Sequence, residues 1–322
     1  MDYLRGLAGL IFILALAYLF SHNKKIIDWR LVAIGMLIQI AIGFIIAKVE
    51  FAQQSFAYLS DQFVVILSFA QKGAEFLYGD LAKNSTNDPG AKHSLGFLFA
   101  FQALPTVIFF SALSAGLYYL GILQKVVYGF AWIMARSMRL SGAESLSASA
   151  NIFMGQTEAP LLVRPFMARM TKSELNCLMV GGMATIAGSV LGAYVSFLGG
   201  GNPAEQSRFA GYLLSASIMN APAAIVLAKV FMPEEQPEQI DRQLKVDKDK
   251  IGVNFVDSLA TGAADGLKLA LNIAAMLLAF IAVIYAINWI LVDGIGAITG
   301  LNQFVVESTD GVFNGFSLQY IL

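Results

Sequence analysis

The amino-acid sequence predicts an all-α membrane protein that crosses the bilayer several times. Hydrophobic residues make up 57% of the 322 residues, whereas Asp, Glu, Lys and Arg make up only 13%, roughly half the charged share of a soluble domain. These polar side chains are too few to cover a water-exposed surface, so lipid must solvate much of the chain. Long uncharged runs alternate with short charged or turn-rich stretches, which is the pattern of helical spans joined by loops.

Charge and cysteine content exclude several other classes. The 21 basic and 22 acidic residues give a net charge of -1, so no excess positive field is available to bind nucleic acid. Cys177 is the single cysteine and lies inside an apolar run, which excludes a disulfide framework and a cysteine-based metal site. We expect Cys177 to be a small core residue.

The first two spans are residues 6–21 and 31–47, which carry no charge and are joined by a basic loop at 22–30. Because Lys and Arg favour cytoplasmic loops, this loop is expected inside and the N-terminus outside. A signal peptide is the alternative for the first run. It is disfavoured because lysines and a second span follow, with no small-residue cleavage pattern.

The next elements are an interfacial helix, an outer loop and a returning span. Residues 50–79 place apolar side chains at helical spacing but include Asp61, Lys72 and Glu75, which favours a helix lying in the interface plane. The turn-rich stretch 84–92 is expected to be a loop on the outer face. The uncharged run 94–124 then returns to the inside, with a kink expected at Pro105.

The second half of the chain repeats this alternation. Residues 175–204 and 209–228 are two further apolar runs, and the charge-dense stretch 233–250 reads as a cytoplasmic linker. An amphipathic segment at 251–267 is a second interfacial candidate, followed by a span at 269–292. The glycine-rich stretch 294–322 stops within its pattern, so the functional unit is expected to be longer than this sequence.

Residues 143–163 cannot form an ordinary span. Two apolar arms, 146–154 and 159–163, flank a polar centre that begins at Gly155, and neither arm reaches the ~17 residues that a crossing needs. Arg136 and Arg169 lie at opposite ends of the segment, so both ends should share the cytoplasmic side. A re-entrant helical hairpin satisfies both conditions, and such broken helices are where transporters bind substrates and ions.

Glu158 is the most informative residue of the polar centre. An ionisable group at membrane depth costs several kcal/mol unless it faces a cavity or a partner, so it is a candidate functional residue. The alternative is a structural carboxylate paired with Arg164 or Arg136 near the interface. Gln156 and Thr157 beside it offer both donors and acceptors, which suits an uncharged, hydrogen-bonding ligand better than a phosphate.

Three stretches of the sequence resemble the concentrative nucleoside transporters. They are SASANIFMGQTEAPLLVRP around the polar centre, LMVGGMATIAGSVLGAY at 178–194, and ADGLKLALNIAAMLLAFIAVI at 264–284. The resemblance implies a non-enzymatic, sodium-coupled nucleoside importer that works by alternating access. It also implies an inverted-repeat transport domain on a homotrimeric scaffold, in the lipid bilayer of a bacterial cytoplasmic membrane. Uridine is an example of the expected substrate, while the preference between purines and pyrimidines stays open.

The resemblance also implies which residues bind the substrate. Gln156 and Thr157 match positions that hydrogen-bond the nucleobase, and Glu158 matches one that acts on it through water. Val190, in the helix after the hairpin, matches an apolar contact to the base.

A sodium site is implied by the same comparison. Asn151 and Met154 in the hairpin and Thr185 and Ile186 in a partly unwound helix match its ligands. Ligation by oxygen alone suits a hard monovalent cation, and the ends of half-helices supply carbonyl groups.

On this basis the chain is expected to divide into five parts. Residues 1–125 would be scaffold spans with the first interfacial helix, and 126–232 the transport part with the hairpin at about 143–163 and two following helices. The cytoplasmic linker would cover 233–250, an interfacial helix and scaffold span 251–293, and the start of an incomplete second repeat 294–322. The second hairpin, with the residues that bind the ribose, would follow Leu322.

Three alternative functions are weighed against sodium-coupled import. Proton coupling within the same family is the nearest, because Glu158 could titrate at membrane depth. A channel is less favoured because the Gln-Thr-Glu centre suits saturable binding. An intramembrane hydrolase would need a base near Ser147 or Ser149, and neither histidine lies in an apolar segment.

Overall fold

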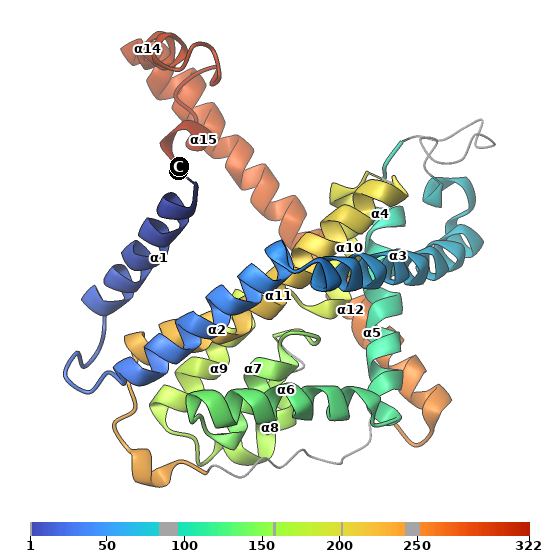
Figure 1. The fold of residues 1–322 in the computed structure, drawn as a ribbon. Helices are drawn as coiled ribbons and strands as arrows, with labels where there is room; N and C mark the ends of the chain where they lie inside the picture. The colour runs from blue at the N-terminus through green and yellow to red at the C-terminus, as the bar shows by residue number, and fades with distance from the viewer. Residues whose placement is uncertain (1, 84–95, 157–158, 201, 242–251) are drawn as a thin grey trace. The chain divides into compact units, whose positions relative to one another are not determined.

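The computed structural model describes residues 2–83, 96–156, 159–200, 202–241 and 252–322. Every regular element within these ranges is helical (Figure 1). The elements before the hairpin are α1 (Asp2–Leu19), α2 (Trp29–Lys48), α3 (Glu50–Tyr78), η1 (Gly79–Ala82), α4 (Phe99–Gln102), α5 (Leu104–Tyr119) and α6 (Ile122–Met138). The hairpin and the helices after it are α7 (Gly142–Ala150), α8 (Ala159–Met167), α9 (Lys172–Ala184), α10 (Gly188–Leu198), α11 (Pro203–Phe231) and η2 (Pro237–Gln239). The chain ends with α12 (Phe255–Trp289), the π-helix η3 (Ile290–Gly296), α13 (Ala297–Thr299), α14 (Leu301–Ser308) and α15 (Leu318–Ile321).

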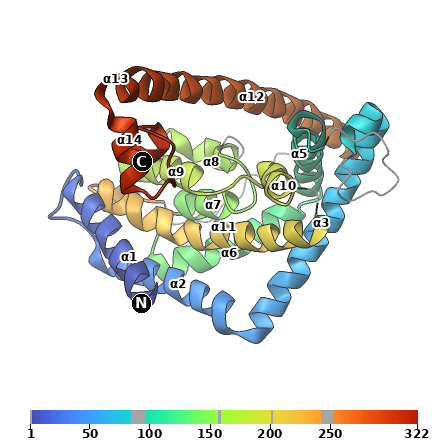
Figure 2. The same ribbon diagram turned by 90° about the horizontal axis from the view of Figure 1, so that it is seen from above.

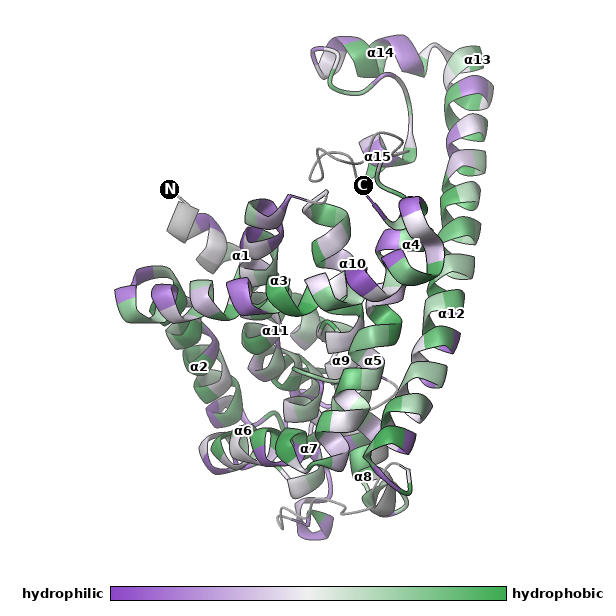
Figure 3. Ribbon diagram, turned by 90° about the vertical axis from the view of Figure 1, so that its right-hand side faces the viewer, coloured by the Kyte–Doolittle hydropathy of each residue, from purple (hydrophilic) through white to green (hydrophobic). Residues whose placement is uncertain are grey.

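Five of the described helical segments are long and apolar enough to span a bilayer. They are Trp29–Lys48, Phe99–Tyr119, Lys172–Leu198, Pro203–Phe231 and Phe255–Thr299, and a shorter apolar helix covers Ala8–Leu19. Hydrophobic residues predominate along α2, α5 and α12 (Figure 3). The five long segments overlap later runs that the sequence predicts as spans, which supports the composition argument for lipid as the solvent. The predicted first span at 6–21 corresponds only to the shorter helix.

Helix α3 is amphipathic, as its sequence predicts, and it is not among the candidate spans. Its buried positions include Ser60, Leu67 and Ala74, which are seven residues apart along the chain and therefore share one face of the helix. The opposite face exposes Lys72. This division of faces is consistent with the interfacial position that the sequence predicts.

The kink expected at Pro105 coincides with an interruption at Ala103 in the helical segment Phe99–Tyr119. Beyond it α5 begins at Leu104, with the proline in its first turn, where a missing N–H costs nothing. One other detail of the sequence prediction is wrong. The interfacial candidate at 251–267 and the span after it are not separate elements, because α12 runs without interruption from Phe255 to Trp289. No proline lies in either segment to end the helix.

The chain forms two compact units, Met1–Leu267 and Lys268–Leu322. In the first unit, α2 and α11 lie side by side and α7 contacts α6, α8, α9 and α11, which leaves α7 in the middle of these helices (Figure 2). In the second unit, the Asn302 side chain bonds the Val292 carbonyl and the Phe316 N–H, at 2.9 Å each, and so connects η3 to the turn before α15. Within the first unit, the first arm of the hairpin, α7, is buried along its whole length.

Candidate functional site

The predicted hairpin is confirmed as two short helices, α7 and α8, that contact each other. Its first arm, α7, begins with a capping box in which the Ser141 hydroxyl accepts from the Glu144 N–H and the Glu144 carboxylate accepts from the Ser141 N–H, both at 3.1 Å. Every residue of α7 is buried. At the tip, the Phe153 and Met154 N–H groups both donate to the Ala150 carbonyl, at 2.9 and 2.7 Å. These bonds close a turn at residues 150–154, directly after α7.

The helix that follows is broken, as the family resemblance implies. Helix α9 ends at Ala184, α10 begins at Gly188, and Thr185 between them has an extended backbone with φ -114° and ψ 157°. A break removes the regular pairing between carbonyls of one half-helix and N–H groups of the other. The Thr185 hydroxyl donates to the Gly181 carbonyl at 2.8 Å, which leaves the lone pairs of its oxygen directed elsewhere.

Glycines allow the hairpin tip to lie directly on this break. A Cβ atom at Gly188 would overlap the carbonyl oxygen of Phe153, and one at Gly182 would lie 3.0 Å from the Cβ of Gln156. At Gly181 the neighbour is the side chain of Asn151, 3.1 Å away. These glycines therefore allow the hairpin tip and the broken helix to pack closely against each other.

Asn151 is the outstanding polar residue of this contact. Its side chain is fully buried, and within the described ranges neither its Oδ1 nor its Nδ2 has a hydrogen-bond partner. A buried amide without partners is costly, because each unpaired group forfeits its hydration. Asn151 and Thr185 both lie at Gly181, so two of the four predicted sodium ligands approach the same residue. This neutral oxygen set fits a monovalent cation.

The other predicted ligands are positioned less directly. Met154 is buried, and Ile186 packs against the core cluster that contains Leu67 and Phe110. The Phe153 carbonyl at Gly188 brings the two segments together next to these residues. In the part of the chain that the structure describes, no group of three or more His, Cys, Asp or Glu residues could hold a metal ion.

Of the predicted substrate residues, Gln156 is exposed at the tip and Val190 is half-buried in the first turn of α10. Thr157 and Glu158 lie outside the described residues. The predicted Cys177 core position is confirmed, since its side chain is 3% exposed.

Sequence reasoning missed Asn220 on α11. Its side-chain Nδ2 donates to the Ala184 carbonyl at 2.9 Å, at the last helical residue before the break. A polar residue inside the apolar run 209–228 was the available signal, because such residues commonly bond a neighbouring helix in membrane proteins.

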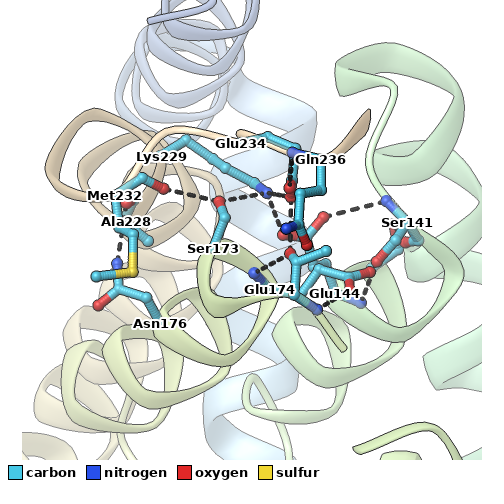
Figure 4. A network of polar contacts seen from close by, with 12 residues as sticks. Ser141, Glu144, Ser173, Glu174, Asn176, Ala228, Lys229, Met232, Glu234 and Gln236 are labelled. Carbon is cyan, nitrogen blue, oxygen red and sulfur yellow. Dashed lines mark hydrogen bonds and ion pairs between the residues drawn. The ribbon is translucent and has the colours of Figure 1, made fainter. Parts of the chain in front are cut away.

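A buried charge cluster at the base of the hairpin was also missed (Figure 4). The Lys229 ammonium forms an ion pair with the Glu144 carboxylate, lies 3.5 Å from the Glu234 carboxylate and donates to the Ser173 hydroxyl at 2.9 Å. Glu144 is 1% exposed and Lys229 8%. A lone lysine at the end of one apolar run and a lone glutamate in another were the signals that could have found it.

Hydrogen bonds extend this cluster to the start of α9. The Thr171 hydroxyl donates to the Glu234 carboxylate at 2.9 Å, and Ser173 donates to the Met232 carbonyl at 2.7 Å. Thr171 also forms a capping box with Glu174. The first turns of α7 and α9 are therefore held to the end of α11, while the hairpin tip meets the break at the other end of α9.

Comparisons with known proteins cover nearly the whole chain. Residues 8–81 match the family description "Na+ dependent nucleoside transporter N-terminus", residues 100–201 match "Nucleoside recognition", and residues 212–322 match "Na+ dependent nucleoside transporter C-terminus".

Individual relatives agree with these matches. An uncharacterized transporter of Haemophilus influenzae is 40% identical over 97% of this chain and 70% of its own length. The sodium/nucleoside cotransporter 1 of Mus musculus is 39% identical over 89% of this chain, which spans 41% of that protein. The solved structure of CNTnw in an inward-facing substrate-bound state has a TM-score of 0.80 and 37% identity, covering 93% of this chain and 68% of that one.

The matched fold is that of an all-helical protein with several membrane spans, and the likeness extends over both the hairpin and the broken helix. The chain belongs to the concentrative nucleoside transporter family, a family of sodium-dependent nucleoside transporters and not of enzymes.

Proposed function

We propose that this protein imports nucleosides together with sodium by alternating access, moving them against their gradient into a bacterial cell. The observation that carries the sodium assignment is Asn151, a fully buried amide whose two polar atoms have no partner among the described residues. A sodium ion coordinated by its Oδ1 would give that oxygen the partner it lacks.

Asn151 and Thr185, with the backbone at Met154 and Ile186, are the proposed sodium ligands. The Thr185 hydroxyl hydrogen is already used by the Gly181 carbonyl, so its oxygen can act as an acceptor toward a cation. An ion held between the tip and the broken helix would hold together two segments that approach closely at Gly181, Gly182 and Gly188. This gives sodium a means to stabilise the substrate-binding arrangement.

Gln156, Thr157, Glu158 and Val190 are the proposed substrate-binding residues. Gln156 is exposed at the tip, where an amide can donate and accept hydrogen bonds with an uncharged ligand such as a nucleobase. Support comes from the relatives, because the mouse protein is named a sodium/nucleoside cotransporter and CNTnw has been solved with substrate bound.

The arrangement in the cell is part of the proposal. We place the protein in the cytoplasmic membrane as a homotrimer, with the N-terminus outside and the stretch 233–250 inside. Residues 126–232 would move as the transport part against a scaffold that includes residues 1–125. The capping boxes and the Lys229 cluster support this, because they join α7, α9 and α11 into one body.

Uptake of radiolabelled uridine into proteoliposomes tests the function. Sodium and proton gradients are imposed separately at the same membrane potential, and concentrative uptake is expected with sodium alone. Uptake driven by a proton gradient in sodium-free buffer would replace sodium with proton coupling, and uptake that never exceeds equilibration would favour a channel.

The Glu158→Gln variant tests the site in the same assay. Concentrative uptake should be abolished while the variant inserts and migrates on size exclusion like the wild type, because a carboxylate at membrane depth is retained for binding. Unchanged uptake would remove Glu158 from the site.

A further inference from the structure

Two asparagine bonds join α9 and α11 in opposite directions. Asn176 near the start of α9 donates from Nδ2 to the Ala228 carbonyl on α11, and Asn220 on α11 donates from Nδ2 to the Ala184 carbonyl on α9. Both distances are 2.9 Å and both side chains are half-buried. The two bonds are chemically the same, and they differ in what lies at the accepting carbonyl.

The Ala228 carbonyl lies in the last turn of α11 and also accepts the Met232 N–H, whereas the Ala184 carbonyl lies at the break. In an unbroken helix the N–H four residues later would pair with Ala184, but α10 begins only at Gly188. Asn220 therefore supplies a side-chain donor where the backbone ladder ends. Because the Ala184 carbonyl belongs to the same peptide plane as the Thr185 nitrogen, this bond also fixes the orientation in which the chain enters Thr185.

We infer that Asn220 is a positioning residue for the sodium site: it holds the end of α9 so that Thr185 and Ile186 present their oxygens to the ion. The inference rests on the proposed function. Asn220 acts through the Ala184 carbonyl and is not itself a ligand. Without its donor, the break could adopt other backbone conformations, and sodium binding would have to select the competent one.

The role of Asn220 is tested by measuring both sodium binding and transport with purified protein. Asn220→Leu removes the donor at similar volume, and Asn176→Leu is the matched control at the unbroken part of the same helix pair. The melting temperature is measured while sodium replaces choline at constant ionic strength, which yields the sodium concentration for half-maximal stabilisation.

Both variants should lower the melting temperature in choline by similar amounts, since each loses one interhelical hydrogen bond. Only Asn220→Leu should raise the half-maximal sodium concentration, by roughly fivefold for a positioning bond of ordinary strength. In uptake assays, its KM for uridine should be normal at saturating sodium and raised at low sodium, as reciprocal linkage requires.

An equal sodium response in the two variants would overturn the role of Asn220. A wild-type protein that sodium does not stabilise more than choline would instead overturn the proposed function. If Asn220→Leu does not fold, the smaller pair Asn220→Ala and Asn176→Ala is compared by the same criteria.

Discussion

Replacing Lys229 by methionine should destabilise the protein strongly, because it leaves a buried carboxylate without its counter-charge. The Lys229 ammonium pairs with Glu144, which is 1% exposed, and also bonds Ser173 and approaches Glu234. Methionine retains most of the aliphatic volume, so loss of packing contributes little. The effect is therefore an electrostatic one at the base of the hairpin.

Removing one partner of a buried ion pair typically costs about 3–5 kcal/mol. For a domain of this size a kilocalorie per mole shifts the melting temperature by about 2–4 °C, so a drop of roughly 10 °C is expected. Lys72→Met is the matched control. Its ammonium lies 2.9 Å from the Glu75 carboxylate, but the lysine side chain is 77% exposed, and such surface pairs contribute at most about 1 kcal/mol.

The assay is thermal unfolding of purified protein in detergent, followed by the loss of the monodisperse peak on size exclusion. The double variant Lys229→Met with Glu144→Gln should recover most of the loss, since glutamine is neutral and still accepts from the Ser141 N–H. Equal melting temperatures for Lys229→Met and Lys72→Met would refute the reasoning. A double variant no more stable than Lys229→Met alone would show that the lost charge pair is not the cause.

Three further changes test the site and its topology. Gly188→Ala should destabilise the protein by about 1–3 kcal/mol because its Cβ would overlap the Phe153 carbonyl. Gly129 has open space around it, so Gly129→Ala should be neutral or stabilising by up to about 1 kcal/mol. The melting temperatures of the two variants test this difference. Thr185→Val should raise the sodium concentration for half-maximal uptake and weaken uridine binding mainly at low sodium, and a uniform loss at all sodium concentrations would contradict a ligand role. In a background without Cys177, single cysteines replace four exposed residues: Arg136, Lys172, Ala204 and Glu238. Intact cells are treated with a membrane-impermeant thiol reagent, and only the cysteine that replaces Ala204 should be labelled. Labelling of either Arg136 or Lys172 alone would show a full crossing in place of the hairpin.

Much of the fold is predictable because lipid imposes simple rules on composition and length. A run of apolar residues either reaches the thickness of the bilayer or does not. This predicted the spans and, together with the arginines at both ends, the hairpin at 143–163. Ser141 and Thr171 begin capping boxes, a motif that the sequence indicates by a Ser or Thr followed three residues later by Glu. Glu158 and Asn151 were predicted as site residues from local sequence, one by its charge and the other by the resemblance of its motif.

Contacts between distant residues depended on the tertiary structure. Lys229 and Glu144 are far apart in the chain and each looks anomalous alone, and only the packing of α11 against α7 makes them a pair. The same holds for Asn220, because its proposed role depends on the helix break to which it is hydrogen-bonded. Local patterns fix helix type and ends because those energies act over a few residues. Which polar groups meet across helices depends on how each helix is rotated about its axis and shifted along it. Close packing of side chains throughout the unit sets both, and no periodic sequence pattern records them.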